Sequence, residues 1–150
     1  MLQIKNELYL YCLNFADDRI RSAEQAILSA QEASVDDTKS SAGDKYETTR
    51  EMMQQEISRN QTQLHEARKL KLALSAINPG KSHETVQPGS LVLTDQGNFF
   101  ISISAGQVKL GDRSYFAVSP ISPMGKALMG STKGSTVTFN HKDFTILDVI

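Results

Sequence analysis

Ser119-Pro-Ile-Ser-Pro-Met-Gly-Lys-Ala-Leu-Met-Gly130 is the stretch of sequence that best defines the fold. Within it, Ser122 is followed by a proline and then by a run without further prolines, and Gly130 closes the run. A hydroxyl side chain at the N-cap, a proline at the first helical position and a terminal glycine are typical of a short helix. The stretch therefore predicts one short helix that begins directly after Ser122.

The segments around this helix have the composition of short β-strands. Branched and aromatic residues gather in short runs that glycine, asparagine and aspartate residues interrupt. These runs cover 91–94, 99–104, 107–110, 115–118, 136–139 and 144–150. The first two flank a turn at 95–98 and predict a β-hairpin. One short helix on a strongly bent antiparallel sheet is an α+β architecture.

The first half of the chain has the periodicity of helices. Apolar residues repeat at 3-4 spacing in two stripes, which the polar segment 34–43 separates. The first stripe comprises Ile4, Leu8, Tyr11, Phe15, Ile20, Ala23, Ile27 and Ala30, and the second comprises Met53, Ile57, Asn60, Leu64, Ala67, Lys71, Leu74 and Ile77. Each helix has only the stripe of the other to pack against, which predicts an antiparallel hairpin, a coiled coil. We expect a hairpin over 1–78, a linker over 79–89 and a small β-domain over 90–150.

Composition excludes several classes of function. Sixteen basic and seventeen acidic residues give a net charge of −1, whereas a duplex nucleic-acid binder normally has a basic excess. The single cysteine, Cys12, cannot form an internal disulfide and is expected to be a buried, unreactive thiol in a reducing compartment. No apolar run reaches the roughly 20 residues of a membrane span, and no signal-peptide layout opens the chain. A cytoplasmic protein is expected.

The sequence offers no sign of an independent enzyme. It contains no glycine-rich phosphate loop and no nucleophile constellation. The three histidines are scattered without the spacing of metal ligands, and we interpret all of them as surface residues: His65, His83 and His141.

Acidic residues gather where the two predicted helices meet. Asp44, Glu47 and Glu51 share one face at the start of the second helix, and Asp36 and Asp37 lie across the loop. Exposed carboxylates of this kind could hold Mg²⁺, above all where another protein supplies further ligands. The pattern Asp44-x-x-Glu47 is also a capping pattern, and acids in a first turn suit the helix dipole. Capping and metal binding both remain open.

A helical hairpin combined with the motif at 119–130 resembles the Gre family of bacterial transcript-cleavage and elongation factors. Pro88-Gly-Ser-Leu-Val92, Lys133-Gly134 and the strand at 136–139 belong to the same resemblance. It implies a coiled coil joined to an FKBP-like domain. In that family the globular domain binds the rim of the secondary channel of RNA polymerase, and the hairpin enters the channel. Acids at its tip help to position Mg²⁺ and water for hydrolysis of a backtracked transcript in the active site of the polymerase.

The resemblance assigns expected roles to particular residues. Contacts with the polymerase rim are expected from Ser122, Pro123 and Met124, to which we add Lys126 as a candidate partner contact. The residues expected at the shared Mg²⁺ are Asp36, Asp37, Asp44 and Glu47, with Asp44 and Glu47 as the catalytic candidates. The partners would be RNA polymerase and, indirectly, the 3′ end of the transcript, with no cofactor of the protein's own.

The tip departs from the family pattern. Cleavage-competent members have an acidic pair before an Asn-Ala-Glu-Tyr stretch, and alignment on Tyr46 puts Lys39 and Ala42 at those two positions. A channel-binding regulator that does not stimulate cleavage is therefore the direct alternative.

Two further functions come from other classes. A peptidyl-prolyl isomerase would fit an FKBP-like domain, but the chain lacks tryptophan for an aromatic pocket. A structural coiled-coil adaptor would dimerise through its apolar stripes. A hairpin whose two stripes pack against each other should instead be monomeric.

Overall fold

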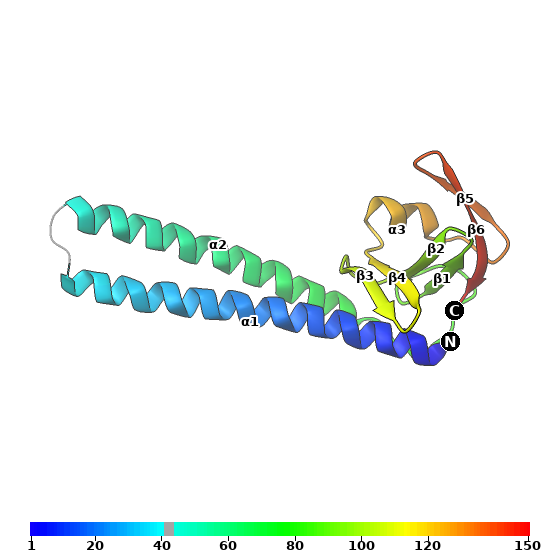
Figure 1. Ribbon diagram of the computed structural model, residues 1–150, viewed down its shortest axis with the longest axis horizontal. Helices are drawn as coiled ribbons and strands as arrows, with labels where there is room; N and C mark the ends of the chain where they lie inside the picture. The colour runs from blue at the N-terminus through cyan, green and yellow to red at the C-terminus, as the bar shows by residue number, and fades with distance from the viewer. Residues whose placement is uncertain (41–43) are drawn as a thin grey trace. The chain divides into compact units, whose positions relative to one another are not determined.

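The computed structural model describes residues 1–40 and 44–150, with side chains described for 1–33 and 47–150. Two long helices precede a six-stranded sheet that carries one short helix (Figure 1). The elements are α1 (Leu2–Ser40), α2 (Asp44–Ser75), β1 (Leu91–Thr94), β2 (Gly97–Ile101), β3 (Gly106–Leu110), β4 (Arg113–Val118), α3 (Pro123–Leu128), β5 (Thr136–Phe139) and β6 (Lys142–Val149). The predicted α+β class is confirmed.

The chain divides into two compact units. The sheet unit comprises Met1–Phe15 and Leu72–Ile150, and the hairpin unit comprises Ala16–Lys71. The first turns of α1 and the last turn of α2 thus belong to the same unit as the strands. The expected boundaries at 78 and 90 follow the change of periodicity along the sequence, whereas the compact units follow contacts in space.

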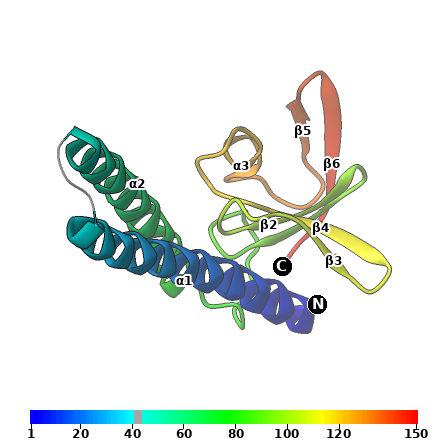
Figure 2. The same ribbon diagram turned by 60° about the vertical axis from the view of Figure 1, so that its left-hand side comes forward.

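In the hairpin unit, α1 and α2 run antiparallel (Figure 2). The Nζ atom of Lys71 on α2 lies 2.8 Å from Oδ1 of Asp17 on α1, so an ion pair joins the two helices. A polar loop was expected over 34–43, but 34–40 are helical, because α1 continues to Ser40. Extending an existing helix costs little per residue, and polar residues can therefore join its end.

The second apolar stripe is confirmed except at Lys71, which is exposed. The other positions are buried or half-buried: Met53, Ile57, Asn60, Leu64, Ala67, Leu74 and, just beyond the end of α2, Ile77. The stripe of α1 is confirmed only in part. Tyr11 is 40% exposed, and the buried positions next to it are Cys12 and Ala16. Ala16, Ala23 and Ala30 then recur every seven residues as buried positions. Small side chains allow two helices to approach closely, while a pattern based on large apolar residues overlooks them.

The strands form one sheet in the order β3-β4-β2-β1-β6-β5. The predicted hairpin is confirmed, since β1 and β2 pair antiparallel with Leu91 opposite Phe100. The sheet was expected to be antiparallel throughout, but β2 and β4 pair in parallel, with Phe99 opposite Phe116. The intervening β3 pairs antiparallel with β4 and forms one edge of the sheet.

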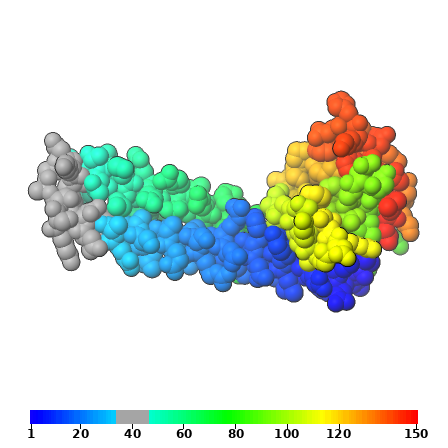
Figure 3. Space-filling model, viewed as in Figure 1, coloured from blue at the N-terminus to red at the C-terminus, as the bar shows by residue number. Residues whose placement is uncertain are grey.

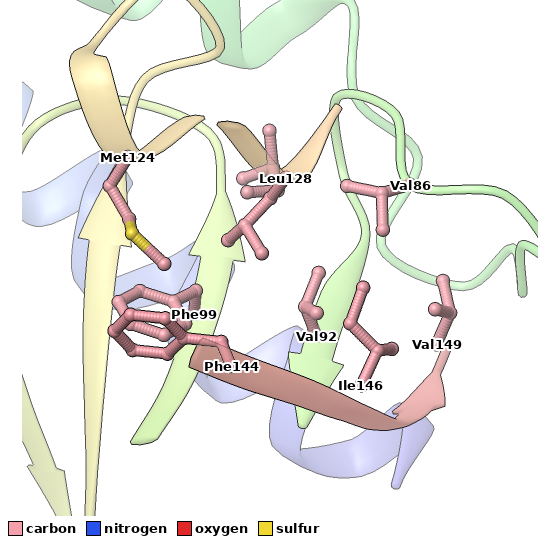
Figure 4. Close-up of a cluster of buried hydrophobic side chains, with 9 residues drawn as sticks. Val86, Val92, Phe99, Met124, Leu128, Phe144, Ile146 and Val149 are labelled. Carbon is pink, nitrogen blue, oxygen red and sulfur yellow. The ribbon is translucent and has the colours of Figure 1, made fainter. Parts of the chain in front are cut away.

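One face of the sheet packs against α3. We call this cluster the α3 core, and its members are Val86, Val92, Phe99, Ile101, Met124, Leu128, Phe144, Ile146 and Val149. Figure 4 shows Met124 and Leu128 reaching from α3 toward the side chains of the sheet. The ring centroids of Phe99 and Phe144 lie 6.1 Å apart in an edge-on arrangement, which is favourable for aromatic pairs.

Side chains on the opposite face of the sheet are also buried. Leu91 and Phe100 alternate with members of the α3 core along β1 and β2 and are 0% exposed, and Tyr115 on β4 is 1% exposed. Leu8 and Cys12 of α1 are fully buried, and Cys12 Sγ lies 3.6 Å from Ser102 Oγ, just beyond the end of β2. The start of α1 therefore contacts the sheet near the end of β2.

Candidate functional site

The predicted short helix is confirmed as α3, with Ser122 as its N-cap. The Oγ atom of Ser122 accepts a hydrogen bond of 3.1 Å from the backbone N–H of Gly125 and donates one of 2.7 Å to the carbonyl oxygen of Ser119. The backbone N–H of Ser122 donates to the carbonyl oxygen and to the Oγ atom of Ser119. These bonds satisfy groups that the first turn of a helix leaves without partners.

Gly125 stands where no side chain fits. A β-carbon at this position would lie 1.9 Å from the carbonyl oxygen of Ser119 and 2.9 Å from Ser122 Oγ. The chain segment before α3 thus folds directly over Gly125. The local structure accounts for three residues of the 119–130 motif: Ser119, Ser122 and Gly125.

The end of α3 is joined to the linker that follows α2. The backbone N–H of Gly130 donates to the carbonyl oxygen of Val86, and the N–H of Val86 donates to the carbonyl oxygen of Ser131. Val86 itself is part of the α3 core. The helix is therefore held at its start by Ser119 and Ser122 and at its end by the linker, which makes it a rigid platform.

The side chains predicted to contact a partner separate into two groups on this platform. Met124 is 9% exposed and packs in the α3 core, so in the free chain it is a packing residue. Pro123 and Lys126 are exposed, and Ile121 in the preceding turn is 79% exposed. We call Ile121, Pro123 and Lys126 the α3 surface. Figure 3 shows the α3 segment, in orange, at the exterior of the sheet unit.

The acidic candidates lie at the start of α2 and the end of α1. Glu47 is exposed in the first turn of α2, which begins at Asp44, and Glu51 is exposed one turn further on. Three of the predicted metal ligands lie outside the residues whose side chains are described: Asp36, Asp37 and Asp44. Within 1–33 and 47–150, no group of three or more His, Cys, Asp or Glu side chains is arranged to hold a metal ion. Metal binding at the tip stays a prediction.

Cys12 is buried, as predicted. Burial raises the pKa of its thiol, while the hydrogen bond with Ser102 acts in the opposite direction as the smaller effect. A thiol with a raised pKa is a poor nucleophile at neutral pH. The structure supports the interpretation of Cys12 as a packing residue.

The sequence interpretation missed two polar residues of the sheet unit. Lys5 is fully buried, although it lies outside the predicted apolar stripe of the first helix, which includes Ile4 and Leu8. His83 was expected at the surface like His65 and His141, but it is half-buried, and its Nδ1 lies 2.9 Å from Ser90 Oγ. The partners of Lys5 come from distant parts of the chain, and the partner of His83, Ser90, is seven residues away, so neither contact follows from the immediate neighbours in the sequence.

Comparison with known proteins finds no family model and no curated protein that matches the chain. In the part of the chain that the structure describes, no helix combines the length and the apolar character needed to cross a membrane.

Proposed function

We propose that this chain is a Gre-like regulator of transcription, which binds RNA polymerase and modulates elongation through the secondary channel. The proposal depends on the resemblance of the 119–130 motif and on the combination of a helical hairpin with a small, mostly antiparallel sheet. The sheet unit would correspond to the FKBP-like domain of the family and bind the rim of the channel. The hairpin would enter the channel.

The main observation behind the proposal is that some residues of the 119–130 motif have structural roles, whereas others are exposed without one. Ser119, Ser122 and Gly125 have structural roles within the fold. Ile121, with 79% of its surface exposed, has no such role within the fold and is free to contact a partner. The α3 surface is thus the part of the motif that a partner would contact.

The length of the hairpin helices suits insertion into a channel. α2 has 32 residues, which at about 1.5 Å per residue corresponds to a helix of roughly 48 Å. Glu47 lies in its first turn with an exposed carboxylate, and Asp36, Asp37 and Asp44 are its neighbours in sequence near the tip. In this proposal these acids share the catalytic Mg²⁺ of the polymerase. The chain would be an accessory factor and not an enzyme, act as a cytoplasmic monomer, and reach the RNA 3′ end only indirectly.

A regulator without cleavage activity is the second candidate, and a specific observation favours it. Lys39 and Ala42 stand at the two positions where cleavage-competent family members have acids. Binding to the polymerase and stimulation of cleavage are therefore separate claims that need separate tests.

The binding claim is tested by the affinity of the chain for purified bacterial RNA polymerase. Ile121→Asp is expected to weaken binding about tenfold, because loss of a buried apolar contact at an interface costs on the order of 1.4 kcal/mol or more. Leu147→Asp is the matched control, since Leu147 is 53% exposed on β6 and is not part of the α3 surface. Equal affinities of the two variants for the polymerase would show that the α3 surface is not the contact. If the wild type did not bind the polymerase, the whole proposal would be wrong.

The cleavage claim is tested with a stalled, backtracked elongation complex. If the tip acids position Mg²⁺, Glu47→Gln reduces transcript shortening at saturating protein, whereas Glu56→Gln, an equal change at an exposed position further along α2, leaves it unchanged. Slower nucleotide addition without any transcript shortening would identify the non-cleaving regulator.

A further inference from the structure

Lys5 is the most unusual polar residue of the sheet unit. Its side chain is fully buried, and its Nζ atom donates to the carbonyl oxygens of Lys81, at 2.6 Å, and Ile150, at 3.0 Å. Lysine is almost never fully buried, because its ammonium group loses its hydration and needs compensating partners. Here the two acceptors come from the linker after α2 and from the residue that follows β6. One side chain thus connects three segments that are far apart in sequence.

A closed ring of short connections passes through this lysine. Ile150 exchanges two backbone hydrogen bonds with Leu91, and Leu91 follows Ser90 in the chain. Ser90 is fully buried, and its Oγ lies 2.9 Å from Nδ1 of His83. His83 is two residues from Lys81, whose carbonyl oxygen accepts from Lys5. We call this circuit the Lys5 ring.

The hydrogen bonds around Ser90 are satisfied by a neutral His83 that carries its hydrogen on Nε2. Ser90 Oγ accepts the backbone N–H of Gln87 at 3.0 Å, so that its hydroxyl hydrogen can point to Nδ1 of the imidazole. A protonated ring carries hydrogen on both nitrogens and cannot accept at Nδ1. Protonation would therefore leave the buried Ser90 hydroxyl hydrogen without its acceptor and bring a second positive charge into the ring that already contains Lys5.

We propose that the Lys5 ring is an acid-sensitive clasp that holds the start of α1 on the sheet and loosens when His83 is protonated. The charged groups that act on the imidazole are Lys5 from α1 and Lys81 from the linker, while 87–90 contribute no charge. Glu84, the next residue in the linker, is exposed. Both facing charges are positive and oppose the addition of a proton.

The pKa of His83 agrees with this geometry. Burial lowers it below its ordinary value, and Lys5 and Lys81 lower it further. Because the pKa is lower in the closed state than in the open state, the open state binds more protons. The clasp is therefore most stable above the ordinary imidazole pKa of about 6.5 and loses stability as the pH falls below that value.

Cys12 provides a reporter of this opening without any modification of the protein. It is the only thiol of the chain, it lies on the same face of the sheet two turns after Lys5, and it is fully buried. Its rate of reaction with 4,4′-dithiodipyridine, a reagent that works in acid, measures how often the start of α1 leaves the sheet. The rates at pH 7.5 and pH 5.5 are each divided by the rate of a free model thiol.

The decisive comparison is wild type against His83→Asn, in which an amide replaces the titrating ring and can still bond Ser90. At pH 5.5 an open-state histidine is about nine-tenths protonated, so the opening equilibrium of the wild type rises by up to roughly tenfold over pH 7.5. His83→Asn should show no such rise. The same pH dependence in both proteins would overturn the proposal.

A second measurement keeps the proposal testable if the variant folds poorly. Ring NMR of the wild type reports the titration of His83, which is compared with the ordinary imidazole pKa of about 6.5. We expect His83 to titrate below this value and to move toward it in Lys5→Met, which removes the ammonium charge. Titration of wild-type His83 at or above this value would overturn the clasp, whatever the variants do.

Discussion

Gly125→Ala tests the close packing at the start of α3. The new β-carbon would lie 1.9 Å from the carbonyl oxygen of Ser119, whereas an ordinary contact of this kind needs at least 3 Å. The chain before α3 must therefore move by more than 1 Å. Such a movement separates Ser122 from the N–H of Gly125 and pulls at Met124, which packs in the α3 core.

The cost can be estimated from these contacts. Loss of an N-cap hydrogen bond costs about 1 kcal/mol, and forcing an extra carbon into a packed site costs about 1–3 kcal/mol. We expect the sheet unit to lose about 3 kcal/mol, which for a chain of this size lowers the melting temperature by roughly 6–12 °C. Differential scanning calorimetry is the suitable assay, because the helices dominate the far-ultraviolet signal.

Gly80→Ala is the matched control for this substitution. A β-carbon at Gly80 meets only the side chain of Asn78, at 3.4 Å, and the backbone there does not have a positive φ. We expect a change within about 1 kcal/mol, toward higher stability, because alanine reduces the freedom of the unfolded chain. Equal melting temperatures of the two variants would refute the close contact between Gly125 and Ser119.

Three further tests concern an N-cap, a core position and an ion pair. Ser122→Ala should destabilise the protein by about 1 kcal/mol through the lost cap, and Ser122→Thr should largely restore it, as measured by calorimetry. Leu128→Ala, at a fully buried position, should cost about 2–5 kcal/mol in denaturant unfolding, whereas Leu147→Ala, at a position 53% exposed, should change stability by less than about 1 kcal/mol. Lys71→Met should remove the ion pair with Asp17 at a cost of at most about 1 kcal/mol that decreases in high salt, since both side chains are partly exposed to water.

Local signals in the sequence predicted the elements that local interactions determine. α3 follows from a serine, a proline and a glycine within one short stretch, and its N-cap bond joins residues three positions apart. The hairpin of β1 and β2 follows from two apolar runs around a turn. By contrast, Phe99 of β2 pairs in parallel with Phe116 of β4, while β3, which lies between them in the sequence, forms the edge of the sheet. No local residue pattern determines this order of strands.

The polar residues of the sheet unit were missed for the same reason. Lys5 and Ile150 are 145 positions apart, so that the acceptor of the buried ammonium group cannot be read from the neighbourhood of the lysine. His83 and Ser90 are close in sequence, but the burial of their contact depends on the segments that surround it. At the tip, the acids were found from spacing alone, and their role depends on a partner that supplies further ligands.

The contacts of the first helix residues show which part of the chain belongs with the strands. Met1–Phe15 lies in the same compact unit as the sheet. A segment that started near 79 or 90 would lack the hydrogen bonds of Lys5 with Lys81 and Ile150 and the contact of Cys12 with Ser102. The first fifteen residues are thus part of the sheet unit. The change from helical to extended periodicity near 78 marks a change of secondary structure, while the physical unit includes the start of the first helix.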